Sequence, residues 1–249
     1  MSARALEVRA RRGRIAAAIR WLGDSSEAEL GGGDGDAVEL FLHVPEVADA
    51  ALVGPWLSPG ELARRARIQH PRALADLLAG RRLIRSIFAA RLGIGPDEVR
   101  LVEGERGALA LDAMYGAPWH FNLSHTDGLV ALAIARRPIG VDVEWVTRPG
   151  RTVELADRYF AVAEVAGLRA LPEAAQRDRF FELWTLKEAY IKARGLGLAI
   201  PLASFAFELA DDITVALAPE ANDAPDARWR FALWDVGGEH RLALAVAVG

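Results

Sequence analysis

The stretch FNLSHTDGLVALAIARRPIGVDVEWV, residues 121–146, decides the fold of this chain because it contains successive strands separated by turn residues. Its alternating and apolar runs predict strands at residues 121–124, 130–135 and 139–144. The last run carries two acids, Asp142 and Glu144, inside the otherwise apolar sequence IGVDVEWV. Residues i and i+2 of a strand point to the same face, so these two carboxylates project together.

Two neighbouring carboxylates raise each other's pKa unless a cation or hydrogen-bond donors compensate them. The residues alone leave two interpretations open. Asp142 and Glu144 either point into water from the edge of a sheet, or they belong to a site that holds a cation.

Composition narrows the class of protein. The chain has 249 residues, 52% hydrophobic and 26% charged, which is typical of a globular protein of one large domain or two smaller ones. A formal net charge of −4 gives no general attraction to nucleic acid or to an anionic membrane. The absence of cysteine excludes disulfides, thiolate nucleophiles and cysteine-based zinc sites, and it is compatible with a reducing cytosol.

The chain is expected to consist of two similar lobes preceded by an extension. Residues 1–36 are interpreted as a basic N-terminal extension, either an amphipathic helix with Ile15, Ile19 and Leu22 on one face or a ragged segment, ending in the joint GGGDGD. After it, strand, helices and strands follow one another twice. This order predicts an α+β fold with an N-terminal lobe at residues 37–137 and a C-terminal lobe at residues 138–249.

The helices have recognisable ends. Ser58 before Pro59 predicts a helix start, Pro71 is expected to divide the following segment into two helices, and Gly195 is expected to end a later helix. The C-terminal lobe is predicted to contain helices at residues 153–160 and 178–194, followed by strands at residues 205–209, 213–217, 229–234 and 241–248.

The segment RFFELWTLKEAYIKARGLGL offers partners for the two acids. Glu188 lies on the flank of the apolar face of this helix, and Lys192, four residues later, lies beside it. One interpretation is a partly buried ion pair that contributes little. The other is that Glu188 completes a three-carboxylate site with Asp142 and Glu144, which suits Mg²⁺, while Lys192 and Lys187 add positive charge for a phosphate group.

The three fragments FNLSHT, IGVDVE and WTLKEAYIKARGLGL, at these separations, closely resemble the surfactin-type 4′-phosphopantetheinyl transferases, over about residues 58–207. The resemblance implies an enzyme that moves the 4′-phosphopantetheine arm of coenzyme A onto a serine of an apo acyl or peptidyl carrier protein. It also implies a requirement for Mg²⁺ and the release of 3′,5′-ADP. The implied fold is a pseudo-dimer of two α+β lobes with the active site at the seam.

The resemblance also implies roles for individual residues. Asp142, Glu144 and Glu188 are the implied metal ligands, and Lys192 is expected to contact the pyrophosphate and to help the leaving group, with Lys187 nearby. Ser124 and His125 are expected to contact the phosphates of coenzyme A. The base that takes the serine proton is Glu188 or a metal-bound water. The nucleophile belongs to the carrier protein.

Two positions depart from the family pattern. Where the family has a Gly-Lys/Arg-Pro turn, this chain has Gly107, Ala108 and Leu109, and Asp76 stands where an arginine for the 3′-phosphate is usual. Arg64, Arg65 and Arg72 are nearby candidates to replace that arginine, and Arg64 and Arg72 are the two expected to do so.

Two alternatives to a transferase remain at this point. The first is a non-catalytic homologue that binds carrier proteins, and the second is another Mg²⁺-dependent phosphodiesterase. The protein is further expected to be a cytoplasmic monomer that binds neither nucleic acid nor membrane.

Overall fold

The structure of the chain is a computed structural model, and its description covers residues 6–13, 15, 17–22, 37–104, 107–150, 152–195, 200–210, 212–217 and 228–248. The predicted joint at residues 31–36 lies outside this range. None of the helices within it combines the length and the apolar character that crossing a lipid bilayer requires. The chain divides into two compact units. Unit 1 comprises the described part of Ala16–Arg136, and unit 2 comprises the described parts of Leu6–Ile15 and Arg137–Gly249.

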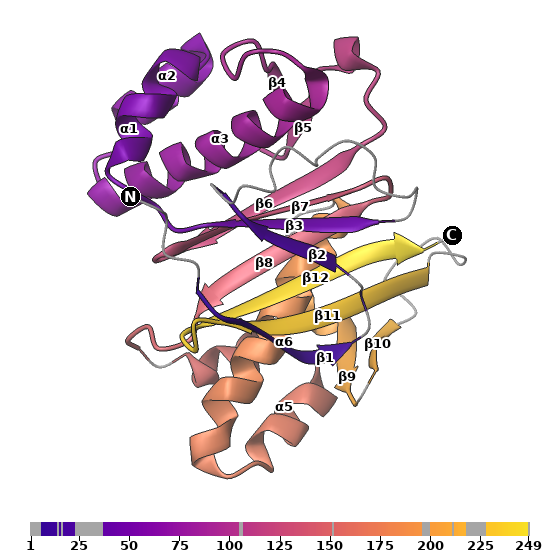
Figure 1. Cartoon of the computed structure of the whole chain (residues 1–249). Helices are drawn as coiled ribbons and strands as arrows, with labels where there is room; N and C mark the ends of the chain where they lie inside the picture. The colour runs from indigo at the N-terminus through magenta and orange to yellow at the C-terminus, as the bar shows by residue number, and fades with distance from the viewer. Residues whose placement is uncertain are drawn as a thin grey trace. The chain divides into compact units, whose positions relative to one another are not determined.

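Unit 1 is a four-stranded sheet with a helical layer on one face (Figure 1). The sheet has the order β2-β3-β7-β6, and α3 packs on β3, β6 and β7. Its core includes Ile84 and Phe88 of α3 and Leu132 of β7. The elements are β2 (Ala17–Trp21), β3 (Val38–His43), α1 (Ala48–Val53), α2 (Pro59–Arg67), α3 (Pro71–Leu92), β4 (Leu101–Glu103), β5 (Leu109–Leu111), β6 (His120–Thr126) and β7 (Leu129–Ala135), with single 3₁₀ turns at Gly54–Trp56 and Ala113–Tyr115.

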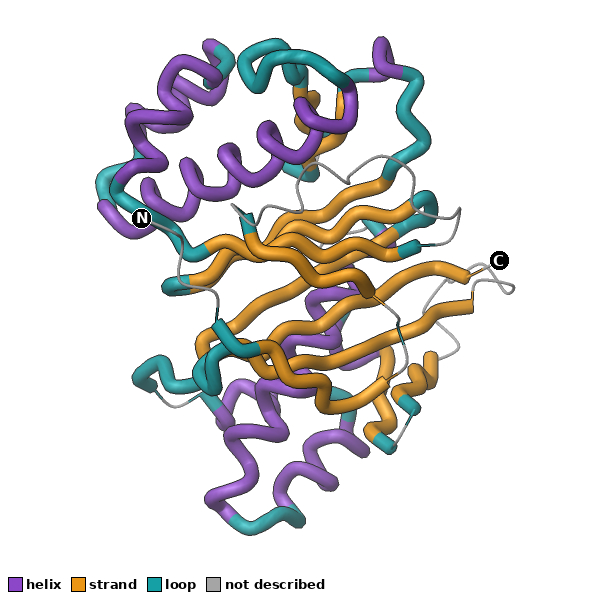
Figure 2. Tube along the Cα trace, in the orientation of Figure 1, coloured by secondary structure: helices purple, strands orange, loops and turns teal. Residues whose placement is uncertain are grey.

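Unit 2 has the same kind of architecture. Its sheet has the order β1-β11-β12-β8, and the long helix α6 packs on β8 and β12 (Figure 2). The elements are β1 (Val8–Gly13), β8 (Ile139–Trp145), α4 (Ala156–Tyr159), α5 (Val162–Arg169), α6 (Glu173–Arg194), β9 (Phe205–Leu209), β10 (Ile213–Leu217), β11 (Arg228–Val236) and β12 (His240–Val248), with 3₁₀ turns at Val153–Leu155 and Leu202–Ser204.

The two units repeat one topology. In unit 1 a strand, three helices, a two-stranded hairpin and two further strands follow one another as β3, α1 to α3, β4 and β5, β6 and β7. Unit 2 has the same series as β8, α4 to α6, β9 and β10, β11 and β12. The sheet orders β3-β7-β6 and β8-β12-β11 correspond as well. The predicted α+β fold with two similar lobes is therefore confirmed.

The N-terminal segment differs from the prediction. Instead of forming an amphipathic helix, its described residues form two strands in different units: β1 pairs antiparallel with β11, and β2 pairs parallel with β3. In the sequence VRARRG, Val8 and Ala10 alternate with arginines, which is the period of a strand. β1 and β2 each add a strand beside an outer strand of the repeated sheet, β11 and β3, where backbone groups need partners.

The predicted helix ends are present. Ser58 caps α2 by accepting a hydrogen bond from the backbone N–H of Glu61, whose side chain in turn accepts one from the Ser58 N–H. α3 begins at Pro71, and Gly195 ends α6 with a positive φ of 65°.

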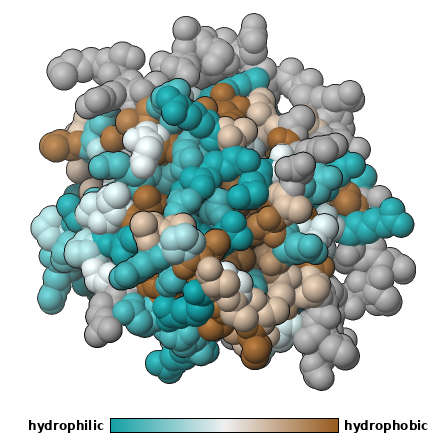
Figure 3. All heavy atoms as spheres, turned by 90° about the horizontal axis from the view of Figure 1, so that it is seen from below, coloured by the Kyte–Doolittle hydropathy of each residue, from teal (hydrophilic) through white to brown (hydrophobic). Residues whose placement is uncertain are grey.

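The surface carries dispersed apolar side chains. On the face in Figure 3, hydrophilic residues occupy the centre and hydrophobic residues lie in smaller areas around them. The large hydrophobic side chains that are exposed in the described part are Val47, Leu52, Leu62, Val102, Met114, Leu155 and Val162.

A glycine sets the distance between β8 and α6. A Cβ atom on Gly140 would lie 2.0 Å from the carbonyl oxygen of Ala189 and 2.4 Å from the backbone nitrogen of Ala193. Both contacts are to helix backbone, which cannot turn aside as a flexible side chain can. The helix therefore lies on the strand at a separation that only glycine permits.

This contact predicts opposite effects of two Gly-to-Ala substitutions in unit 2. Gly140→Ala is expected to lower the free energy of unfolding by about 3 kcal/mol, because α6 must move away from β8. Gly167→Ala in α5, where an added Cβ meets nothing within 4 Å, is expected to raise it by about 0.5–1 kcal/mol through helix propensity. Urea unfolding of both variants measures the difference, and equal effects would contradict the proposed close contact.

Candidate active site

Four of the predicted site residues come from the two elements that meet at Gly140. Asp142 and Glu144 follow Gly140 at two-residue intervals on β8, and Glu188 and Lys192 lie on α6. Lys192 Nζ donates to Asp142 Oδ1 over 2.6 Å and lies 3.3 Å from the carbonyl oxygen of Val141. The Asp142 side chain is 7% exposed and that of Lys192 is 28% exposed, so the ion pair opens to solvent on the lysine side.

Glu144 is held by groups that the sequence prediction did not include. Trp184 Nε1 donates to Glu144 Oε1 over 2.9 Å, and Arg148 donates to Glu144 Oε2 over 2.6 Å. Burial, and secondly the charge of Asp142, raise the pKa of Glu144 to about 7, although Arg148 opposes this shift. The sequence contained one signal for the Arg148 contact, because Arg148 follows Glu144 by four residues. Trp184 was interpreted only as part of the apolar face of its helix.

Glu188 lies in the same electrostatic environment. Burial, and then the negative charge of Asp142, raise its pKa, and Lys192 acts in the opposite direction. Unlike Asp142 and Glu144, the Glu188 carboxylate has no hydrogen bond or ion pair with the other described residues. α6 therefore presents a partly buried acid toward the two acids of β8.

The donor set fits a hard cation. Within the part of the chain that is described, no three acidic or histidine side chains already enclose a metal position. Nevertheless, Asp142 raises the pKa values of both Glu144 and Glu188, and a divalent cation would relieve this repulsion. Carboxylate oxygens are the ligands that Mg²⁺ prefers, so the chemistry of these three residues agrees with the predicted metal.

Lys187 does not lie with this group, and the structure contradicts its predicted role beside the phosphates. Its side chain is fully buried and pairs with Glu164 of α5 over 2.7 Å. It also donates to the carbonyl oxygens of Leu202 and Phe205. Neighbouring helix residues are about 100° apart around the axis, so Lys187 faces the interior while Glu188 flanks β8.

The predicted phosphate-binding residues Arg72, Ser124 and His125 belong to unit 1. One ion pair and one carboxylate–imidazole contact connect the start of α3 with the end of β6 and the turn after it. Asp76 lies 3.6 Å from His125 Nδ1, and Arg72 lies 2.8 Å from Asp127. The side chains of His125 and Arg72 are 50% and 60% exposed, and Ser124 beside them is buried.

Arg64 is not part of this group. It lies on α2 and is 3.5 Å from Glu103 of β4, with both side chains about half exposed. Of the two expected substitutes for the missing arginine, Arg72 is the one that contacts the β6–β7 turn, through Asp127, two residues after His125.

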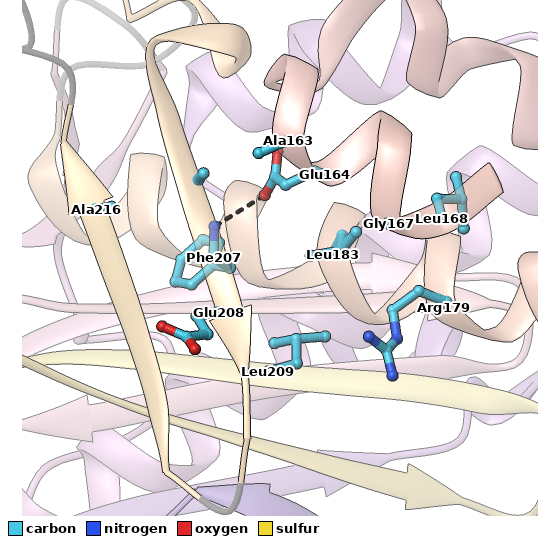
Figure 4. A pocket seen from close by; sticks show the side chains of 11 residues that line it. Ala163, Glu164, Gly167, Leu168, Arg179, Leu183, Phe207, Glu208, Leu209 and Ala216 are labelled. Atoms are coloured by element: carbon cyan, nitrogen blue, oxygen red, sulfur yellow. Dashed lines mark hydrogen bonds between the residues drawn. The ribbon is translucent and has the colours of Figure 1, made fainter. Parts of the chain in front are cut away.

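The pocket in Figure 4 is distinct from the acids of β8. It has a volume of about 400 Å³ and is lined by α5, α6, β9 and β10, including Gly167, Leu183 and Leu209. Glu164 at its wall accepts a hydrogen bond from the backbone N–H of Phe207, shown as a dashed line, as well as the contact from Lys187. The Glu164 carboxylate is thus committed to holding β9 and α6 together.

The new position of Lys187 predicts a stability effect. Lys187→Met is expected to lower the free energy of unfolding by about 3–5 kcal/mol, because it leaves the Glu164 charge buried without its partner. Glu164→Gln in the same chain is expected to restore part of the loss. The matched control is Arg169→Met, which removes one member of a partly exposed ion pair with Asp157 and should cost at most about 1 kcal/mol. Equal stability of Lys187→Met and wild type in urea unfolding would return Lys187 to the candidate phosphate-binding residues.

Comparisons with known proteins identify the family. The family model of the 4′-phosphopantetheinyl transferase superfamily matches residues 138–247, which include Asp142, Glu144, Glu188 and Lys192. A 4′-phosphopantetheinyl transferase of Bacillus subtilis is 33% identical over 182 residues, covering 73% of this chain and 78% of the relative. The 4′-phosphopantetheinyl transferase HetI of Nostoc is 34% identical over 194 residues, covering 77% of this chain and 78% of the relative.

A solved structure, the holo-[acyl-carrier-protein] synthase of Thermotoga maritima, covers 44% of this chain and 62% of its own at 21% identity, with a TM-score of 0.36. That likeness is too weak to add to the assignment, which depends on the two curated relatives. Both exceed 30% identity over more than two thirds of their own length. The chain belongs to the 4′-phosphopantetheinyl transferase superfamily and is an enzyme that transfers the 4′-phosphopantetheine group to carrier proteins.

Proposed function

We propose that the donor is coenzyme A, that the acceptor is a serine of an apo acyl or peptidyl carrier protein, and that the reaction requires Mg²⁺ and releases 3′,5′-ADP. The observation that carries this proposal is the group of three carboxylates and one lysine where β8 lies against α6, inside the residues that match the family. The acceptor serine oxygen attacks the β-phosphorus of coenzyme A. The bond from that phosphorus to the bridging oxygen breaks, and 3′,5′-ADP leaves with the bond electrons.

Asp142, Glu144 and Glu188 would hold Mg²⁺. The metal, when bound, supplies positive charge to the diphosphate of the donor. Arg148 donates to Oε2 and Trp184 to Oε1 of Glu144, so these two residues orient the carboxylate that would hold the metal.

Lys192 is proposed to stabilise the departing 3′,5′-ADP at the oxygen that bridged the two phosphorus atoms. Its ammonium group is anchored at Asp142 and remains 28% exposed, so a phosphate oxygen can reach it from solvent. Negative charge grows on the bridging oxygen as the bond breaks, and a fixed cation acts most strongly on charge that develops during the reaction. Glu188, whose carboxylate has no partner among the described residues, is proposed to take the serine proton.

The residues of unit 1 are proposed to hold the nucleotide end of coenzyme A. The side chains of Arg72 and His125 are 60% and 50% exposed, and each contacts an acid at the start of α3 or in the turn after β6, which supports contacts with phosphate oxygens. Ser124, which precedes His125 on β6, is proposed as a third contact, although its side chain is buried. Arg64, on α2, is the weaker candidate because Glu103 lies beside it instead. We further propose that the enzyme acts as a monomer in the cytoplasm.

The transfer itself is the first test. Incubation with coenzyme A, Mg²⁺ and an apo carrier protein is expected to increase the mass of the carrier by one phosphopantetheine group. Asp142→Ala and Glu188→Ala are each expected to lower the rate by roughly a hundredfold or more, since each removes a ligand for the metal. Their circular dichroism should match the wild type, because one of three repelling acids is removed.

The mass of the carrier protein also distinguishes a transferase from a non-catalytic homologue and from a phosphodiesterase. An unmodified carrier that nevertheless binds the protein would indicate a non-catalytic homologue. Cleavage of coenzyme A without modification of the carrier would indicate a phosphodiesterase. Full activity of Asp142→Ala would exclude the proposed metal site.

The second test asks which residues bind the 3′-phosphate of coenzyme A. A charge-assisted contact contributes about 1.5–3 kcal/mol, so wild type is expected to prefer coenzyme A over dephospho-coenzyme A by roughly tenfold or more in kcat/KM. Arg72→Ala and His125→Ala should reduce this preference, whereas Arg64→Ala should preserve it. A preference that survives Arg72→Ala and His125→Ala would assign the 3′-phosphate to other residues.

A further inference from the structure

An ion network crosses the sheet of unit 2 next to the acids of β8. The strand register places Glu144 opposite Arg241 of β12, and Arg241 opposite Asp235 of β11. Cross-strand partners project from the same face of a sheet. Glu144 contacts Trp184 of α6, so this row of alternating charge lies on the face that α6 covers.

α6 is attached to this row by two acids. Asp178 binds Arg241, a guanidinium that is 2% exposed and that also binds Asp235. Glu182, one turn further along the helix and 2% exposed, is surrounded by Arg11, Arg12 and Arg179 at 3.2, 3.5 and 2.9 Å. A buried carboxylate of this kind depends on its cations, because leaving it without them costs free energy.

Arg11 of the N-terminal strand contacts three of the four acids of the network. It contacts Asp178 at 2.5 Å, Glu182 at 3.2 Å and Asp235 at 3.1 Å. The register of β1 with β11 shifts between Ala10 and Arg12, so Arg11 is the extra residue of a β-bulge. In a regular strand Arg11 and Arg12 would point to opposite faces. The bulge directs both side chains to Glu182.

The network holds the same helix that carries the proposed catalytic group. Glu188 follows Glu182 by six residues, about 9 Å along the axis, and Trp184 lies between them. Because a helix is stiff over this length, the contacts of Asp178 and Glu182 set both the rotation and the axial position of the following turns. The orientation of Glu188 and Lys192 toward Asp142 therefore depends on cations that the N-terminal strand supplies.

We propose that Arg11, a residue outside the family-matched segment 138–247, is a positioning residue of this transferase. It acts through Asp178 and Glu182 to hold α6 in the setting that brings Glu188 and Lys192 to Asp142. The inference rests on the proposed roles of Glu188 and Lys192.

The test compares Arg11→Met with Arg9→Met in the full-length chain. Both residues lie on β1, but within the described part of the chain Arg9 pairs with Glu7 and with no acid of the network, and its side chain is 72% exposed. Arg11→Met is expected to lower kcat by roughly ten- to a hundredfold, with a much smaller change in KM, because misplaced groups lose rate rather than substrate binding. Arg9→Met is expected to retain wild-type kinetics.

A spectroscopic readout separates positioning from catalysis. The indole N–H resonance of Trp184, assigned with Trp184→Phe, reports its hydrogen bond to Glu144 and requires no activity. It should shift in Arg11→Met and stay in place in Arg9→Met. An inactive wild type would refute the proposed function, whereas the resonance would still decide the positioning role.

A second variant guards against loss of folding. Arg11→Met combined with Glu182→Gln removes the buried acid together with its cation, and it should fold while retaining the shifted Trp184 resonance. A folded Arg11→Met protein with the wild-type resonance and wild-type kcat would overturn the proposal. So would a lower kcat with an unshifted resonance, because the effect would then act elsewhere.

Discussion

The close contact between β8 and α6 at Gly140 is the constraint on which the site depends. A Cβ atom added at Gly140 would collide with the helix backbone. The distance between the strand and the helix is therefore shorter than it could be if a side chain stood at this position. Asp142 and Glu144, on the same face of β8, consequently meet the flank of α6 instead of solvent. Two acids that would be exposed on a sheet face without a helix are buried here under α6, and their pairing with Lys192, Arg148 and Trp184 follows from that position.

The charges of unit 2 are divided along α6. The first half of the helix carries acids that are neutralised by arginines from β1 and β12. The second half carries Glu188 and Lys192 toward β8. Lys187, between the halves on the opposite side, forms a buried pair with Glu164. The direction in which each charged residue of α6 points thus decides its role. Some bind the helix to the sheet, others belong to the candidate active site, and Lys187 pairs with a buried acid in the interior.

The sequence predicted the features that depend on local patterns. Period-two alternation located β6, β7 and β8, and the capping residues Ser58 and Gly195 located helix ends, because these signals act over a few residues. The partners Arg148 and Trp184 and the interior position of Lys187 were missed, since they depend on which side of a helix faces which strand. The strand β1 was missed because its partner β11 lies far away in the sequence. A short arginine-rich run contains no local signal that it pairs with such a distant strand.

The pairing of Val8 with Val236 also has a consequence for biosynthesis. The ribosome releases β1 long before β11, so the long segment between them must be made before this part of the sheet can close. At about 5–20 residues per second the wait is on the order of ten seconds to most of a minute. Throughout that time the arginines of β1 face solvent, which keeps the waiting strand from pairing with other chains. The sheet of unit 2 can therefore close only after β11 has been made, while β3 and β7 of unit 1 are free to pair much earlier.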